Sequence, residues 1–139
     1  MTFMWMVGFA MFPAVVSAAD VCKDSKTTPD MNQCLSDQIT LAEKELAKYL
    51  EESRRRVAND SRTLAEFEKA QKARVAFRDA HWGAIYQYWA QGSVRGAIAG
   101  SCFLRLTRRR THDLLDADLT YVDTTPPILP EPKLSENDK

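Results

Sequence analysis

The stretch FRDAHW, residues 77–82, places an arginine, an aspartate and one of only two histidines together in an apolar run. Asp79 and His81 are two residues apart, so on a helix they point to different faces and form no dyad. The sequence holds no Ser-His-Asp arrangement with a nucleophile turn, no phosphate-binding glycine loop and no HExxH motif. A dyad of Asp79 with His112 from another helix is the one catalytic alternative. We predict that the protein is not an enzyme, with no catalytic residue and no cofactor.

The cysteines carry the second possible chemistry. There are three of them, Cys22, Cys34 and Cys102, so at most one bridge forms within the chain. A zinc site is not expected, because no CxxC pair exists and the histidines fall at no ligand spacing. A Cys22–Cys34 bridge would close a loop of about a dozen residues and tie the amino-terminal segment to the first helix. Cys102 is then an unpaired thiol that is free, buried or available to form a Cys102-linked homodimer.

The first 19 residues contain no charged side chain and do not belong to the fold. An apolar stretch, a helix-breaking Pro13 and small residues around Ser17 to Ala19 match a secretory signal peptide with its cleavage site. A transmembrane anchor is the weaker reading, because it needs roughly 20 uninterrupted apolar residues. We predict a signal peptide over residues 1–19 and a periplasmic or secreted mature chain with no membrane span. Export permits disulfides and argues against nucleic acid as a partner.

Long helices are the simplest reading of the mature chain. Proline is absent between Asp30 and Asp118, while Ala, Leu, Glu, Lys and Arg abound. The first helix should begin with Thr27 or Thr28 as its N-cap and end near residues 59–60, where Asp60 or Ser61 can cap a second helix. Several aromatic residues widen the apolar face of this second helix, so we expect most of its surface to be buried.

Three glycines, Gly92, Gly96 and Gly100, suggest a loop over residues 92–100 that joins the second helix to a third through residues 102–119. A start of the third helix at Ile98 and Ala99 is the alternative. The final residues, 121–139, are rich in proline and predict a disordered or extended tail. The predicted fold is all-α: an antiparallel three-helix bundle, residues 20–120, with a disulfide-stapled amino-terminal segment and an extended Pro-rich tail. No β-strand alternation is present.

Charge is balanced overall but uneven along the chain. Lys and Arg number 4 against 8 Asp and Glu in residues 20–53, 13 against 4 in residues 54–110, and 2 against 7 in residues 111–139. Two arginine clusters, SRRR at 53–56 and LTRRR at 106–110, contribute to the basic middle. Solvated helix faces explain such clusters, and binding to anionic envelope polymers is the functional alternative.

Three motifs, in order, resemble the small exported bacterial domain of the LprI-type lysozyme inhibitor family. They are MNQC (31–34), AQKARVAFRDA (70–80) and SCFLRLTRRRTHDL (101–114), and the resemblance spans roughly residues 22–115. The positions that match the family pattern are Cys22, Cys34, Gln71, Arg78, Asp79, Ala80, Cys102, Leu106, Thr107 and Arg110. The resemblance implies an exported helical domain that binds and blocks a lysozyme or binds another envelope protein.

The chain departs from the family pattern at two positions. Arg74 stands where the family usually has Trp, and Trp82 stands where it usually has Cys. If the family joins its third and fourth cysteines, that bridge is absent here, and Trp82 is expected to pack against the orphan Cys102.

The resemblance also implies roles for the matched polar residues. We interpret Arg78 and Asp79, together with Arg110, as a structural clamp between helices, with His81 on the solvent side. By shape, the 92–100 loop suits insertion into a lysozyme cleft, with Arg95 and Ser93 as the partner-binding residues. The competing hypothesis is an envelope-binding or assembly protein without lysozyme inhibition, which uses its arginine clusters on anionic polymers.

Overall fold

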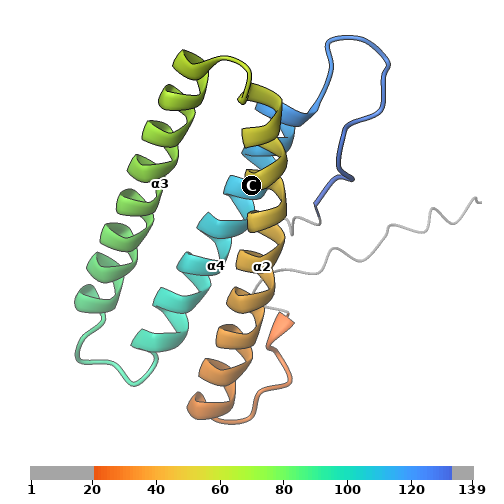
Figure 1. The fold of residues 1–139 in the computed structure, drawn as a ribbon. Helices are drawn as coiled ribbons and strands as arrows, with labels where there is room; N and C mark the ends of the chain where they lie inside the picture. Colours follow the sequence, from red (N-terminus) through yellow and green to blue (C-terminus); the bar gives the residue numbers. More distant parts are fainter. Residues whose placement is uncertain (1–20, 133–139) are drawn as a thin grey trace, which may run out of the picture.

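The computed structural model describes residues 21–132, and over this range the protein is built from helices, with no strand. Its elements are α2 (Thr28–Val57), α3 (Ser61–Tyr88), α4 (Arg95–Leu114) and the π-helix η1 (Leu115–Leu119), which continues α4 without a break. In Figure 1 each long helix runs antiparallel to the one before it, so α2 and α4 point the same way, and this confirms the predicted all-α three-helix bundle. The predicted signal peptide, residues 1–19, lies outside the described residues.

Two helix starts follow the predicted capping chemistry. The Thr27 hydroxyl accepts a hydrogen bond from the Asp30 backbone N–H over 3.2 Å, at the start of α2. The Asp60 carboxylate accepts from the backbone N–H groups of Arg62 and Thr63 over 3.0 and 3.1 Å, at the start of α3. These bonds satisfy amide groups that have no partner inside the helix, so local sequence sets both starts.

The buried core lies mainly between α2 and α4. One cluster, at the η1 end, is formed by Leu46, Tyr49, Leu114, Leu115 and Leu119. A second, toward the start of α2, is formed by Cys22, Leu35, Ala42 and Leu104. From α2, Leu35, Ala42, Leu46 and Tyr49 recur at intervals of seven, four and three residues, so they share one face of the helix. Burial of these side chains drives the pairing of α2 with α4.

The predicted loop over residues 92–100 is wrong, because the link between α3 and α4 spans only residues 89–94 and Arg95 is already helical. Gly96 and Gly100 lie inside α4, where it approaches α2 closely. A Cβ atom at Gly96 would lie 3.0 Å from Oδ1 of Asn32, and one at Gly100 would lie 3.5 Å from Leu35. These glycines permit close helix packing, which offsets their poor helix propensity.

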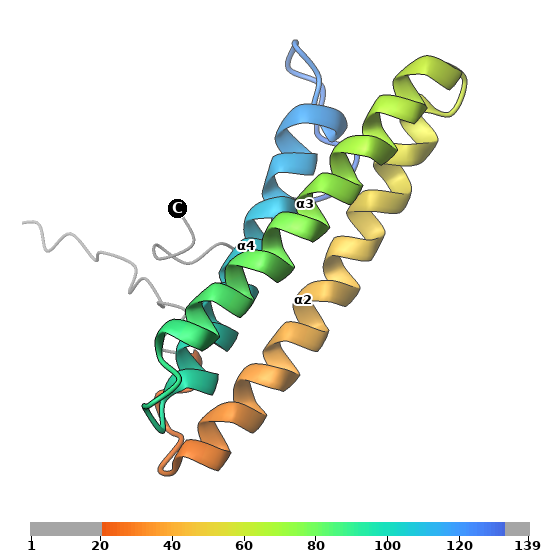
Figure 2. The same ribbon diagram turned by 90° about the vertical axis from the view of Figure 1, so that its left-hand side faces the viewer.

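The prediction that the second helix buries most of its surface is also wrong. Among the residues of α3, none is fully buried. Phe77 is 52% exposed and Trp82 is 38% exposed, so aromatic character here does not mean burial. Figures 1 and 2 show α3 running along α4. It contacts α2 less, through interactions that include the Arg54–Glu68 and Arg78–Glu43 ion pairs, so only part of the α3 surface is covered.

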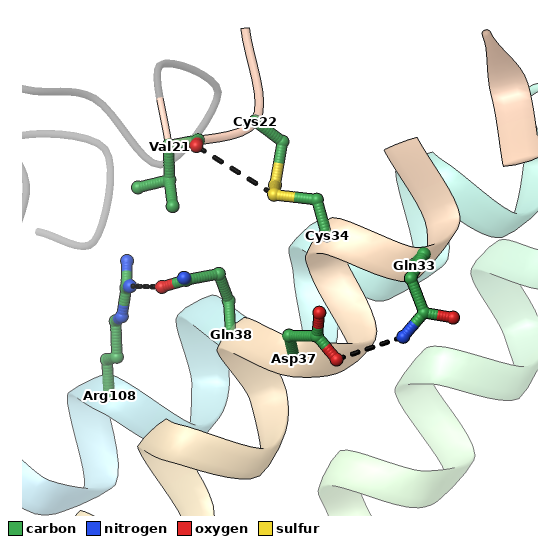
Figure 3. Close-up of a disulfide and its surroundings, with 7 residues drawn as sticks. All are labelled: Val21, Cys22, Gln33, Cys34, Asp37, Gln38 and Arg108. Atoms are coloured by element: carbon green, nitrogen blue, oxygen red, sulfur yellow. Dashed lines mark hydrogen bonds between the residues drawn. A yellow bond between two sulfur atoms is a disulfide. The ribbon is translucent and has the colours of Figure 1, made fainter. Parts of the chain in front are cut away.

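The Cys22–Cys34 disulfide is present, as predicted, with the two Cα atoms 5.9 Å apart. Figure 3 shows it joining the amino-terminal segment to the second turn of α2, with the Val21 carbonyl oxygen 3.8 Å from Cys34 Sγ. Beside it, Arg108 of α4 donates to the Gln38 side chain of α2 over 3.4 Å. The bridge therefore fixes the segment against the α2–α4 pair.

The segment after η1 is extended, and it folds back onto the bundle through residue 132. The Ile128 N–H donates to the Leu119 carbonyl over 2.9 Å, and Leu129 packs on the core cluster at the η1 end. The Tyr49 hydroxyl donates to the Pro130 carbonyl, and burial raises the pKa of this phenol, with a further contribution from the negative charge of Glu45. This part of the predicted tail is thus attached to α2.

Candidate functional site

Arg78 of α3 contacts both other long helices. Its guanidinium lies over the Phe103 ring of α4, 4.2 Å from the ring centroid, and its Nη1 is 3.5 Å from Oε1 of Glu43 on α2. Asp79, the next residue along α3, accepts from Nε and Nη2 of Arg78 at 2.9 Å. The Arg78 side chain is only 20% exposed, whereas Asp79 is 56% exposed. Arg78 therefore has the contacts expected of a clamp, and Asp79 orients it from the same helix.

Arg110 of α4 contacts Gln71 of α3, two helical turns before Arg78 on α3. Its Nε–H donates to Oε1 of Gln71 over 3.0 Å. Burial lowers the pKa of the Arg110 guanidinium below its usual value, and the positive charge of Arg74 lowers it further, against weaker opposition from Asp113 and Asp118. Arg110 is thus a partly buried cation held by a neutral amide.

Two ion pairs complete the attachment of α3. Arg54 of α2 pairs with Glu68, and this contact lowers the pKa of the Glu68 carboxyl. Arg74 of α3 pairs with Asp113 of α4, where the family pattern would place a tryptophan. Because α3 has no buried side chain, these polar contacts carry much of its docking, together with the partly buried Phe67.

A small hollow opens between α3 and α4, with a volume of about 20 Å³. Its polar lining is Gln71, Arg74, Arg78, Thr107 and Arg110, and its apolar lining is Leu46, Val75, Phe77 and Leu106. The space holds little more than one water molecule, so only a small group can enter. Residues from the AQ, RDA and LTxxR motifs thus converge on one place.

The α3–α4 link forms an exposed tip at the end of the bundle where α2 begins (Figures 1 and 2). We define the tip as Tyr88, Trp89, Ser93, Val94 and Arg95, all of which are exposed. Tyr88 is 82% exposed and stacks edge-on against Trp89, with ring centroids 5.6 Å apart. The Arg95 guanidinium lies 4.7 Å from the Tyr86 ring centroid and donates to the Ala90 carbonyl over 3.3 Å. The tip is therefore aromatic and cationic, with its arginine held in place.

The family model described as Lysozyme inhibitor LprI matches residues 19–114. The chain belongs to this family. No curated protein and no solved structure matches at the threshold of the comparison. The match covers α2, α3, α4 and the disulfide, which confirms the resemblance read from the three motifs.

The two departures from the LprI pattern have visible consequences. Cys102 is 5% exposed and takes part in no disulfide, and Nη2 of Arg105 lies 3.9 Å from its Sγ. Trp82 stacks on Tyr86, with ring centroids 5.4 Å apart, and remains 38% exposed. A thiol buried this deeply reaches a second chain only if α4 moves, so the geometry gives no support to a Cys102-linked homodimer of this LprI protein.

The two histidines contact different residues and do not contact each other. His81 is partly buried and stacks on Phe77 at 5.5 Å, so it is less open to solvent than the sequence suggested. His112 lies between the carboxylates of Asp116, at 3.1 Å, and Glu131, at 3.3 Å. Asp79 is paired with Arg78, and the structure gives it no contact with His112. Within residues 21–132 no group of acidic, cysteine and histidine side chains could hold a metal, and no helix there is long and apolar enough to cross a membrane.

Sequence reasoning named Arg78, Asp79 and Arg110 but missed that Gln71 and Arg74 belong with them. The sequence does indicate that residues 71, 74 and 78 share one face of a helix, because they are three and four positions apart. It does not indicate which helix packs on that face, because Gln71 and Arg110 are 39 residues apart and meet only through the register of α3 against α4.

Proposed function

We propose that this protein is an exported binding module that inhibits a lysozyme by placing the tip in the enzyme's cleft. Membership of the LprI family carries the proposal, since that family is described by lysozyme inhibition. The Cys22–Cys34 bridge supports export to a periplasmic or extracellular site, because such bridges persist in oxidising compartments. The family is one of inhibitors, which agrees with a protein that binds and does not catalyse.

The tip has the chemistry that such a cleft requires. Lysozymes cleave sugar chains with a pair of carboxyl groups, so a cation on an inserted element can pair with them. Tyr, Trp and Arg are the residues most often responsible for affinity in protein interfaces. Tyr88 and Trp89 supply the aromatic surface, and Arg95 supplies the cation. Its contact with Tyr86 restricts the arginine before binding, which lowers the entropy lost on binding.

Titration of an animal-type lysozyme with the mature chain, residues 20–139, tests the proposal at low and physiological salt. We expect inhibition at micromolar concentration or below, weakened about tenfold or more by Tyr88→Ala or Arg95→Ala. Arg109→Ala is the matched control, because Arg109 is exposed on α4 outside the tip. Helical circular dichroism of each variant separates loss of binding from loss of fold.

Two outcomes would overturn the proposal. Absence of inhibition of every lysozyme class, at concentrations about 100 times a micromolar dissociation constant, would remove the activity itself. Inhibition lost equally in the Arg109 control would move the binding surface away from the tip. Steep weakening of binding to anionic envelope polymers with salt would favour the polymer hypothesis instead. Against that hypothesis, Arg54 and Arg55 of the first arginine cluster are already paired with carboxylates.

A further inference from the structure

Arg110 carries a positive charge that its surroundings leave without a direct counter-ion. The side chain is partly buried, and its single hydrogen bond in the described chain goes from Nε to the neutral Gln71 amide. Asp113 and Asp118 act on this charge, but within the described residues neither forms an ion pair with Arg110, and Asp113 pairs with Arg74 instead. Burial of a charge is unfavourable without a paired opposite charge, so an anion that reached the terminal nitrogens of Arg110 would be stabilised there.

The other cations around the hollow would add to this stabilisation. Arg74 and Arg78 line the same hollow, and the positive charge of Arg74 contributes to lowering the pKa of Arg110. The carboxylates that pair with Arg74 and Arg78, namely Glu43, Asp79 and Asp113, are each about half exposed, so solvent screens part of their effect. An anion inside the hollow would be surrounded by the three guanidinium groups that line it.

The shape of the hollow restricts which anion can enter. Its volume of about 20 Å³ has room for little more than one carboxylate oxygen, so the rest of the carboxylate and of the molecule would lie at the opening of the hollow. Guanidinium forks match carboxylate oxygens in pairs, which a single lysine would not do. At the rim, Phe77 is 52% exposed and Val75 is 37% exposed, so an apolar body attached to the carboxylate has a surface to rest on.

We propose that the hollow between α3 and α4 is a binding site for the carboxylate of a ligand with an apolar body, held by Arg110 and Gln71 and steered by Arg74 and Arg78. The site is distinct from the tip and does not depend on lysozyme inhibition. A free organic acid and an acidic side chain of a partner protein share this chemistry.

Titration of the ¹⁵N-labelled mature chain with acetate and benzoate, at constant ionic strength, tests the proposal by NMR. We expect saturable shifts of the Arg110 Nε–H and Gln71 amide signals, with a dissociation constant on the order of 1 mM and tighter binding of benzoate than of acetate. Benzamide, which keeps the ring and lacks the charge, is expected not to bind. A benzoyl-capped peptide that carries its carboxylates on acidic side chains, compared with free benzoate, separates the two sources. Larger shifts of the Arg110 and Gln71 signals with the peptide would indicate an acidic side chain of a partner protein, and larger shifts with benzoate would indicate a free organic acid.

Arg110→Gln should weaken benzoate binding by about tenfold or more, and Arg109→Gln, on the adjacent exposed position, should leave it unchanged. If Arg110→Gln loses helical structure, the wild-type signal mapping decides by itself. Equal binding of benzamide and benzoate, equal loss in the Arg109 control, or shifts that stay linear and non-saturating would each overturn the proposal.

Discussion

Gln71 of α3 accepts a hydrogen bond from Nε of Arg110 on α4, over 3.0 Å, at the point where the two helices face each other across the hollow. The bond joins residues 39 positions apart and pairs a neutral amide with a partly buried cation. With Arg78 on Phe103 and Arg74 on Asp113, it holds α3 against α4 by polar contacts. The attachment of α3 should therefore respond to single polar substitutions more than that of α2.

Replacement of Gln71 by Met keeps the length of the side chain and removes the acceptor. Hydrogen bonds to charged groups contribute roughly 1.5–3 kcal/mol. Because this site is only partly buried, water replaces part of the lost bond, and we expect a loss of roughly 1–2 kcal/mol in the free energy of unfolding. Urea denaturation followed by circular dichroism measures the change. Gln87→Met, at an exposed position of the same helix, controls for helix propensity. Equal effects of the two substitutions would mean that the Arg110 contact adds no stability.

Removal of the Cys22–Cys34 bridge should destabilise the whole domain. The bridge spans 12 positions and ties the buried Cys22 to α2, and closure of a loop of this length contributes about 3 kcal/mol. The double variant Cys22→Ala, Cys34→Ala should therefore unfold at a temperature roughly 10–20 °C lower. Reductant should lower the melting temperature of the wild type and leave that of the double variant unchanged. A wild type insensitive to reductant would contradict the expected role.

Cys102 should react slowly with thiol reagents in the folded state. Its 5% exposure means that the reagent needs local opening of α4, whereas denaturant should expose the thiol at once. Reaction with a chromogenic disulfide, with and without urea, gives the ratio of rates. A fast native reaction, or a reductant-sensitive dimer on gel filtration, would show that the thiol is accessible and restore the homodimer hypothesis.

The parts of the fold that the sequence predicted correctly depend on neighbours along the chain. The caps at Thr27 and Asp60 use amide groups two or three residues away, and the Cys22–Cys34 bridge joins segments that are close in sequence. The errors concern packing between helices. Gly100 reads as a break because glycine weakens helices, yet close contact with Leu35 on α2 favours it there. The exposure of Phe77 could not be predicted, because burial needs a covering partner that no local pattern identifies.

Acid should weaken the attachment of α3 through two carboxyl groups. The Arg54 contact lowers the pKa of Glu68 below its ordinary value of 4.5, and hydrogen bonds from Thr63 lower that of Asp60 below 3.8. A lowered folded-state pKa means stability that is present above the ordinary value and is lost as pH falls toward the folded-state value. The urea midpoint should therefore fall as pH drops below about 4.5. The Glu68→Gln and Asp60→Asn variants each lack one of these carboxyl groups, so in each the urea midpoint should fall less with pH. Asparagine at position 60 can still cap the helix, so this variant removes the titrating group and keeps the cap. If the urea midpoint of the double variant Glu68→Gln, Asp60→Asn fell with pH as steeply as that of the wild type, neither carboxyl group would be the source of the pH dependence.

Ser53 of α2 should tolerate loss of its hydroxyl. The residue is 0% exposed, and its Oγ has no hydrogen-bond partner among the described residues. An unsatisfied buried hydroxyl is unfavourable, and alanine is the better helix former, so Ser53→Ala should leave the free energy of unfolding unchanged or raise it by up to about 1 kcal/mol. Ser36→Ala, at an exposed position of α2, measures the helix-propensity part alone. A loss of stability at Ser53 with none at Ser36 would contradict this expectation and show that the hydroxyl stabilises the fold, through a buried water molecule or through its packing.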